Sequence, residues 1–174
     1  MLILLEGPDG AGKTTLAYTL AHGIDHADIR HSSQLKRDPM DEYVGDLHMY
    51  IPGDGMHIIY DRHYLGELIY GPLYRGESKI TPEMQSVIER WLNSRGALLV
   101  HVTHDVDTLR QRCRDKGEDF LQESDIYFVR KQFIEEVEES EIKFKMTVKD
   151  ASPNDVADVL WLAQKLEERV MKYL

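Results

Sequence analysis

The chain opens with a short apolar run, residues 2–5, and passes directly into a glycine-rich segment that runs from Gly7 to Thr14. This segment fits the phosphate-loop pattern G-x-x-x-x-G-K-[ST] without a mismatch. Its glycines allow backbone conformations that bring successive amide N–H groups onto phosphate oxygens. The helix expected from Lys13 onward points its positive end at the same anion. The sequence therefore predicts a strand, loop and helix that bind a nucleoside triphosphate.

Within this loop, the pattern assigns Lys13 to the β- and γ-phosphates and the Thr14 hydroxyl to Mg²⁺. The residues expected to bind ATP are Gly7, Asp9, Gly10, Ala11, Gly12, Lys13, Thr14 and Thr15. No Cys/His spacing resembles a zinc site, and the single cysteine, Cys113, has no partner for an internal disulfide. We expect the eight histidines to be solvated or hydrogen-bonded. Nucleotide-borne Mg²⁺ is thus the expected metal.

Strand-like apolar runs alternate with helical patterns along the rest of the chain. The expected strands are residues 2–5, 27–30, 56–61, 97–103 and 143–149. The expected helices are residues 13–22, 64–70, 82–94, 106–114, 125–139 and 154–173. This alternation predicts an α/β protein with the P-loop NTPase fold, a five-stranded parallel sheet covered by helices on both faces. Ligands of such sheets bind at the carboxyl ends of the strands.

Length and charge limit the domain organisation and the partners. A chain of 174 residues is the size of one domain, so we expect a single P-loop kinase domain over 1–174 with a lid at about 110–124. The formal net charge of −10 disfavours a polynucleotide substrate but leaves one open, because a local basic groove could outweigh it. No apolar run approaches a membrane span and no signal peptide is evident, so we expect a cytoplasmic protein.

The dipeptide Asp61-Arg62 follows the third expected strand, where ligands of such a sheet bind. The carboxylate of Asp61 can orient an acceptor or bind Mg²⁺ through water. The guanidinium of Arg62 can neutralise charge on the acceptor and on the transferring phosphoryl group. The alternative is a surface ion pair, which the nearby phosphate loop disfavours.

Two basic segments are candidates for further phosphate contacts. Arg110, Arg112 and Arg114 end a predicted helix and suit a lid that closes over the triphosphate. Arg110 and Arg114 are the catalytic candidates of that lid, and the alternative is that they only complement the helix dipole. Arg37, after the second expected strand, is either an anchor for acceptor phosphate or a surface charge.

Taken together and in this order, these segments resemble the thymidylate kinase family of P-loop nucleoside monophosphate kinases along almost the whole chain. The resemblance implies that Asp9 contacts the 3′-hydroxyl of the acceptor and that Arg37, in Lys36-Arg37-Asp38-Pro39, holds its phosphate. It implies that Tyr70, in Ile69-Tyr70-Gly71, disfavours a ribose 2′-hydroxyl. It also suggests a homodimer.

Three further positions follow from the same resemblance. Asp105, in a segment like the family's Asp-Val-Asp, is expected near the metal through water, and Asp150 and Ala151 beside the adenine. The family's phosphate loop lacks an arginine in its bacterial members, and there the lid supplies one.

The chain departs from the family between Arg37 and Asp61, where only 23 residues replace a longer segment that clamps thymine. Tyr43, His48 and Tyr50 are the candidate replacements, with ordinary packing as the alternative. Tyr74 and Arg75, in an elaborated segment after the Asp-Arg helix, are expected to complete the acceptor pocket.

The leading hypothesis is an ATP- and Mg²⁺-dependent kinase that phosphorylates a pyrimidine deoxynucleotide, most simply dTMP to dTDP. A first alternative is a kinase of a hydroxyl acceptor, such as a deoxynucleoside or a hydroxymethylated pyrimidine, possibly within DNA, with Asp61 as base. A second is a non-catalytic nucleotide-binding module. The lack of an Asn-Lys-x-Asp segment disfavours a GTPase, and the intact Lys13 and Asp61-Arg62 disfavour an inactive protein.

Overall fold

The fold is built on one parallel sheet of five strands. The computed structural model describes residues 1–32, 37–116, 124–149 and 151–173. In space the strands follow the order β2-β3-β1-β4-β5, and each neighbouring pair is parallel. Their bounds are β1 (Leu2–Glu6), β2 (Ala27–His31), β3 (His57–Asp61), β4 (Leu98–Val102) and β5 (Phe144–Val148). The predicted five-stranded parallel sheet is therefore confirmed.

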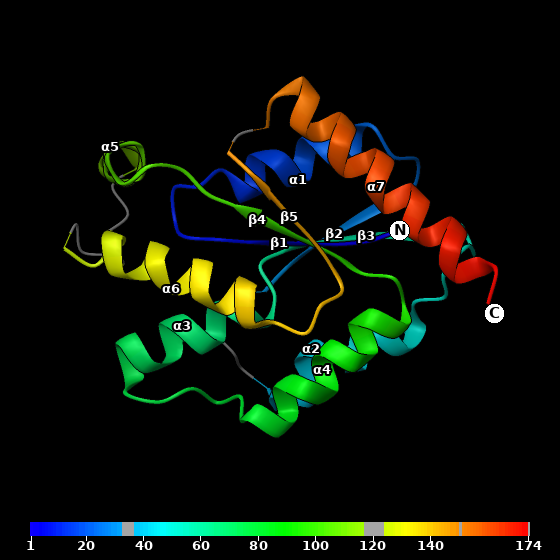
Figure 1. Cartoon of the computed structure of the whole chain (residues 1–174), viewed down its shortest axis with the longest axis horizontal. Coiled ribbons are helices and arrows are strands. Elements are labelled where there is room, and N and C mark those ends of the chain that lie inside the picture. Colours follow the sequence, from blue (N-terminus) through cyan, green and yellow to red (C-terminus); the bar gives the residue numbers. More distant parts are fainter. Residues whose placement is uncertain (33–36, 117–123, 150, 174) are drawn as a thin grey trace.

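Helices cover both faces of this sheet, also as predicted (Figure 1). On one face lie α1 (Lys13–His22) and α7 (Pro153–Met171), which contact each other. On the other lie α2 (Pro39–Tyr43), α3 (Tyr64–Arg75), α4 (Pro82–Ser94) and α6 (Ile126–Glu139). The helix α5 (Val106–Lys116) stands at the left-hand end of Figure 1, where β1 also ends, and a 3₁₀ helix spans Gly45–Met49.

The burial of the strands explains why their apolar sequences predict them well. Every residue of β1 and β4 is buried, as expected for central parallel strands with helices on both faces. The edge strands β2 and β5 are only partly buried; β2 carries Asp28 and Arg30 at alternate positions, and β5 carries Lys145 and Thr147. The core thus lies along both faces of the central strands.

The starts of α4 and α7 are capped by hydroxyl side chains. The Thr81 hydroxyl accepts the Met84 N–H at 3.3 Å, and the Ser152 hydroxyl accepts the Asp155 N–H at 3.2 Å. In both helices proline follows the cap; α4 starts at the predicted residue 82, and α7 starts one residue before the predicted 154. No helix in the described ranges is long and apolar enough to cross a membrane.

Two elements differ from the sequence-based expectation. The helix α3 continues five residues beyond the predicted end at Tyr70, through an internal Pro72, and stops at Gly76, whose φ of 83° suits only glycine well. The short helix α2 was not predicted. Its cap, Asp38, accepts the Met40 N–H at 2.8 Å.

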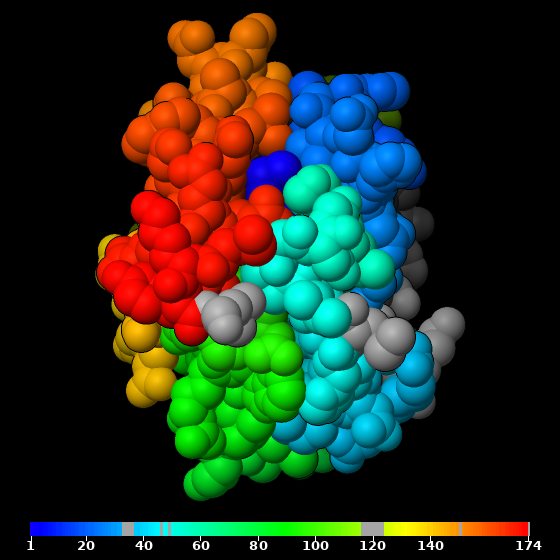
Figure 2. Space-filling model, turned by 90° about the vertical axis from the view of Figure 1, so that its right-hand side faces the viewer, coloured from blue at the N-terminus to red at the C-terminus, as the bar shows by residue number. Residues whose placement is uncertain are grey.

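At the end of the sheet where the strands begin, segments that are distant in sequence lie side by side (Figure 2). In this view α7 lies beside the segment that leads into β3, with α4 below them. The amino group of Met1 donates to Glu167 Oε1 at 2.5 Å and lies 2.6 Å from His57 Nδ1. These contacts tie the starts of β1 and β3 to α7.

A buried carboxylate joins α3, α4 and the chain that enters β5. Glu89 is 2 % exposed and accepts the Tyr64 hydroxyl at 2.6 Å, the Gln85 amide at 3.1 Å and the Glu141 N–H at 2.8 Å. The Tyr64 hydroxyl also lies 3.0 Å from Ser140 Oγ. Burial of this charge is tolerated because each of these donors compensates lost hydration.

Tyr64→Phe should lower the free energy of unfolding by about 1.5–3 kcal/mol, because it removes a donor from a buried carboxylate. Urea unfolding measures this change. The matched control is Tyr127→Phe, at a tyrosine that is 60 % exposed on α6, and it should leave the free energy unchanged. Equal effects of the two substitutions would contradict a stabilising role for the Glu89 network.

Candidate active site

The phosphate loop takes the shape that its glycines allow. Gly10 and Gly12 have φ values of 77° and 96°, and Gly12 directly precedes α1. A Cβ on Gly7 would lie 2.0 Å from the Val102 carbonyl oxygen, so only glycine fits where the loop crosses the end of β4. Within the described residues no side chain caps α1, and its first-turn N–H groups face the loop as an anion site.

Lys13 folds back over this loop. Its side chain is buried, and Nζ donates to the carbonyl oxygens of Gly7 at 2.7 Å and Pro8 at 2.8 Å. Burial, with a smaller effect of the Arg62 charge, lowers the pKa of Lys13 to about 8. The ammonium group therefore stands above the loop, the place that the sequence motif gives it.

Thr14 and Asp61 bring two oxygen ligands together. The Thr14 hydroxyl donates to Asp61 Oδ2 at 2.6 Å, and Asp61 is 1 % exposed. The second carboxylate oxygen, Oδ1, is buried and has no hydrogen-bond partner among the residues that the structure describes. Hydroxyl, carboxylate and water oxygens are the ligands that Mg²⁺ prefers. This pair fits the expected Mg²⁺ site, with Asp61 acting through water.

Arg62 is held in a strained backbone conformation beside the phosphate loop. Its φ is 75°, a left-handed value that costs a non-glycine residue about 1–2 kcal/mol. Its N–H donates to the Leu5 carbonyl at 3.0 Å, and its guanidinium lies 2.5 Å from Asp9 Oδ1. In this conformation the guanidinium reaches the Asp9 side chain of the phosphate loop.

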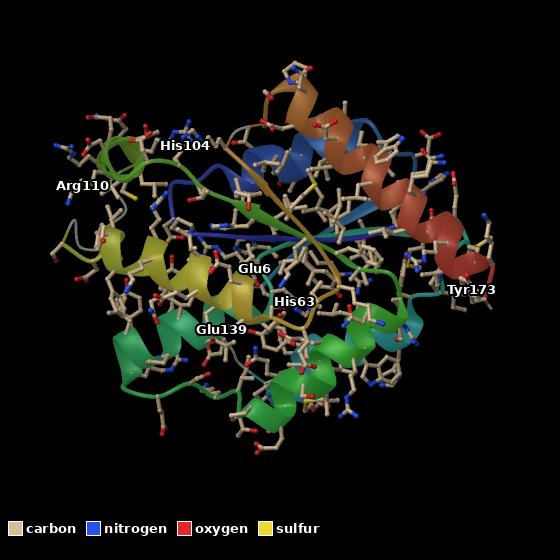
Figure 3. All side chains as sticks on the ribbon, viewed as in Figure 1. Glu6, His63, His104, Arg110, Glu139 and Tyr173 are labelled. Carbon is tan, nitrogen blue, oxygen red and sulfur yellow. The ribbon has the colours of Figure 1, made fainter. Side chains whose placement is uncertain are left out.

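Glu6 fixes this turn from the neighbouring strand. Its Oε1 accepts the N–H groups of His63 at 2.9 Å and Leu65 at 3.0 Å, and thereby caps α3, which its own N-cap residue does not. Glu6 and His63 lie together near the centre of the molecule (Figure 3). Complete burial raises the pKa of Glu6 to about 7, although the two N–H groups and the Lys13 charge oppose that rise.

Tyr70 reaches the phosphate loop. Its hydroxyl accepts the Asp9 N–H at 3.2 Å. The ring stacks on Tyr74 with centroids 6.0 Å apart and an interplanar angle of 7°, and it meets Phe133 edge to face. Asp9, Arg62 and Tyr70 are thus brought together on the acceptor side of the loop.

Arg37 and Arg75, the other predicted acceptor ligands, bind carboxylates elsewhere. Arg37 Nε lies 3.3 Å from Glu42 Oε2, and its side chain is 65 % exposed. Arg75 pairs with the buried Glu67 at the far end of α3. Neither ion pair involves the phosphate loop. Arg37 and Arg75 could therefore bind an acceptor only if both pairs broke.

Asp105 lies at the start of α5 and is exposed. It accepts both the Thr108 N–H and the Thr108 hydroxyl at 2.8 Å, and these bonds lower its pKa. Its observed contacts are those of a helix cap. Its predicted link to the metal therefore has no support from these bonds, and it stays a prediction.

The helix α5 brings a different arginine to the phosphate loop than the two predicted. Arg112 Nη1 donates to the Gly10 carbonyl at 3.4 Å. Arg110 instead pairs with Asp107 at 3.5 Å, and Arg114 donates to the Arg110 carbonyl. Figure 3 shows Arg110 at the outer end of the molecule, far from Glu6. A helix turns 100° per residue, so residue 112 points to another side than residue 110.

Part of the predicted site lies outside the described residues, namely 117–123 of the lid and Asp150. Ala151 is half-buried against the core at the entry to α7. Thr15 is exposed on the first turn of α1, and Ala11 is buried inside the loop.

The segment between Arg37 and Asp61 does not form an open aromatic clamp. Tyr43 and Tyr50 are 2 % and 1 % exposed and belong to the core, so the packing alternative holds for both. His48 stacks edge to face on Trp91 of α4. Two other aromatic residues lie beside the phosphate loop: Tyr70 bonds the Asp9 N–H, and Tyr74 stacks on Tyr70.

One histidine at the site was missed by the sequence analysis. His31 ends β2, and its Nδ1 lies 3.1 Å from Asp61 Oδ2. The sequence signal that could have found it is its place directly after the expected second strand, at a carboxyl strand end where ligands of such sheets bind. Two other histidines, His63 and His101, are buried, and burial lowers their pKa values to about 3 and about 4.

Solved structures share this fold. No family model and no curated protein matches the sequence. The YorR protein of Bacillus subtilis, solved in complex with phosphorylated GDP, aligns over 94% of this chain and 96% of its own, with a TM-score of 0.77 and 21% identity. Deoxyadenosine kinase from M. mycoides with bound dCTP aligns over 97% and 100%, with a TM-score of 0.58 and 16% identity.

A third neighbour is polyphosphate kinase 2 from Arthrobacter aurescens, with a TM-score of 0.61 and 16% identity over 98% of this chain and 66% of that one. At these identities the likeness shows the fold alone. The chain has the P-loop NTPase fold, in agreement with the sequence analysis.

The raised pKa of Glu6 predicts a pH-dependent stability. Because the folded state binds this proton more tightly than the unfolded state, the stabilisation is present below about pH 4.5 and is lost as the pH rises through about 7. Relative to Glu6→Gln, the wild-type free energy of unfolding should fall by about 3 kcal/mol across this window. Urea titrations of both proteins between pH 4 and 8 test this, and parallel pH profiles would contradict it.

Proposed function

We propose that this protein transfers the γ-phosphoryl group of ATP, with Mg²⁺, to a small nucleotide, with dTMP as the leading acceptor. The observation that carries this proposal is the placement of Arg62, a strained residue whose guanidinium crosses the phosphate loop to Asp9. A protein that only binds nucleotide has no need of a second cation fixed at this cost.

The donor half of the proposal rests on the loop itself. Lys13 and the first-turn N–H groups of α1 would hold the triphosphate of ATP. Thr14 and, through water, Asp61 would hold Mg²⁺, which supplies neutralisation of charge on the β- and γ-phosphates. Arg112, which already contacts the loop, is the arginine of α5 best placed to join them.

The acceptor half rests on Asp9, Arg62 and Tyr70. Arg62 would exchange its contact with Asp9 for the acceptor phosphate, which releases the Asp9 carboxylate to accept a hydrogen bond from a sugar hydroxyl. An acceptor phosphate is already nucleophilic and needs positioning more than a strong base. The preference for a pyrimidine deoxynucleotide comes from the resemblance to thymidylate kinases.

A second candidate is a kinase that phosphorylates the hydroxyl of a deoxynucleoside. It is favoured by the ion pairs of Arg37, the predicted anchor of acceptor phosphate, and of Arg75, the residue expected to complete the acceptor pocket, because both pair with carboxylates away from the loop. The buried Asp61 Oδ1 would then serve as the base that accepts the hydroxyl proton. One of the structural neighbours, the M. mycoides enzyme, is a nucleoside kinase.

Incubation with γ-labelled ATP and Mg²⁺ against separate panels of deoxynucleoside monophosphates, deoxynucleosides and oligonucleotides tests these candidates. We expect label on dTMP. Label only on a deoxynucleoside, or only on an oligonucleotide, would select the hydroxyl acceptor. Bound ATP with label on no acceptor would leave a nucleotide-binding module.

Substitutions in the site should separate binding from transfer. Lys13→Ala should abolish turnover, because the β- and γ-phosphates lose their buried cation. Arg62→Ala should lower kcat by about 100-fold or more and change ATP affinity little, because its charge matters chiefly in the transition state. Steady-state kinetics and ATP titration measure both effects, with Arg90→Ala on α4 as the control that should behave as wild type. An unchanged kcat in Arg62→Ala would remove this residue from the mechanism.

A further inference from the structure

We propose that His31 is a positioning residue, which holds the Asp61 carboxylate so that one of its oxygens is presented to the Mg²⁺ of the bound nucleotide. The inference rests on the proposed function, because it concerns the metal that phosphoryl transfer requires. Neither the phosphate-loop pattern nor the family resemblance assigns any role to this histidine.

The sheet itself brings the two side chains together. In the parallel pairing of β2 with β3, His31 is the register partner of Asp61, and each is the last residue of its strand. Partners in adjacent parallel strands project their side chains to the same side of the sheet. The distance of 3.1 Å from His31 Nδ1 to Asp61 Oδ2 therefore depends on two strands and not on a loop.

The direction of this hydrogen bond follows from the chemistry of the partners. An ionised carboxylate can only accept, so Nδ1 of His31 must carry the hydrogen. Asp61 Oδ2 then receives two donors, His31 Nδ1 and the Thr14 hydroxyl at 2.6 Å. Two donors on one oxygen fix the rotation of the carboxylate.

The other oxygen is what this arrangement leaves for the metal site. Asp61 Oδ1 is buried and has no protein partner within the ranges that the structure describes. Such an oxygen is costly unless a ligand satisfies it. We assign a metal-bound water to it, because the same carboxylate bonds Thr14, the expected Mg²⁺ ligand, through Oδ2. His31 thus determines which Asp61 oxygen meets the metal, without touching the metal itself.

The exposure of the two side chains makes this testable without loss of the fold. The His31 side chain is 52 % exposed, whereas that of Asp61 is 2 % exposed. Substitution of His31 therefore removes a hydrogen bond at the edge of the site and leaves the core intact. Melting temperatures of the variants check this point.

Three substitutions distinguish the two ring nitrogens. His31→Ala removes both, His31→Asn keeps a donor near the position of Nδ1, and His31→Gln keeps one near the position of Nε2. The exposed His22, at the end of α1, provides the matched control His22→Asn. Mn²⁺ binding to the ADP complex, followed by titration calorimetry, and kcat with the labelled acceptor are the two measurements.

We expect His31→Ala to weaken Mn²⁺ binding and to lower kcat by about 10-fold or more each, with little change in the acceptor KM. His31→Asn should restore most of the Mn²⁺ affinity and of kcat. His31→Gln should resemble His31→Ala. The control His22→Asn should resemble the wild type. Mn²⁺ affinity in His31→Ala within about two-fold of the wild type would overturn the inference. So would restoration by His31→Gln alone, or by neither amide.

The failure of this inference can be told apart from failure of the proposed function. If the wild-type protein labels no acceptor, the proposed function fails, and the Mn²⁺ titrations still decide the role of His31. If transfer is observed and His31→Ala retains full Mn²⁺ affinity, the kinase stands and only the role of His31 is lost.

Discussion

The contact on which the site depends is the cap that Glu6 provides for α3. Its carboxylate, at the end of β1, accepts the N–H groups of His63 and Leu65, so the first turn of α3 is tied to the strand that leads into the phosphate loop. This bond fixes the residue just before it, Arg62, relative to the loop. A buried carboxylate is costly, and the raised pKa of Glu6 reflects that cost. The cap therefore couples the stability of the fold to the geometry of the reaction site.

The cations of the site already have partners before a nucleotide binds. Lys13 contacts two loop carbonyls, and Arg62 contacts the Asp9 carboxylate. Buried cations without partners would be destabilising, so these contacts stabilise the fold around the phosphate loop. Under the proposed function, incoming phosphates would replace the same partners, so part of their binding free energy would be spent on breaking these contacts. The charge of the site is thus organised in advance, as electrostatic stabilisation of a transition state requires.

The sequence predicted those features that depend on local pattern. The phosphate loop, the five strands and the position of Asp61-Arg62 at a strand end follow from neighbours in sequence. The sequence did not predict contacts that depend on how strands pair or on how a helix is turned about its axis. His31 meets Asp61 only because β2 pairs with β3, and Arg112, not Arg110 or Arg114, meets the loop because of how α5 packs. The extension of α3 through Pro72 was missed because local propensity argues against it, whereas the buried Gly71 and the Glu67–Arg75 pair stabilise it.

The acceptor side shows how a shortened segment changes a site. With few residues between Arg37 and β3, the described part of this segment forms a five-residue helix and a 3₁₀ turn, in which Tyr43 packs on His63 and Tyr50 is buried in the core. These rings are buried, so they cannot also stack on a substrate base without leaving the core. The stacked pair Tyr70 and Tyr74 is different, because Tyr74 is 49 % exposed and Tyr70 bonds the phosphate loop. Under the proposed function, the tyrosines of α3, of which Tyr70 bonds Asp9, are therefore better placed to contact an acceptor base than the segment that precedes β3.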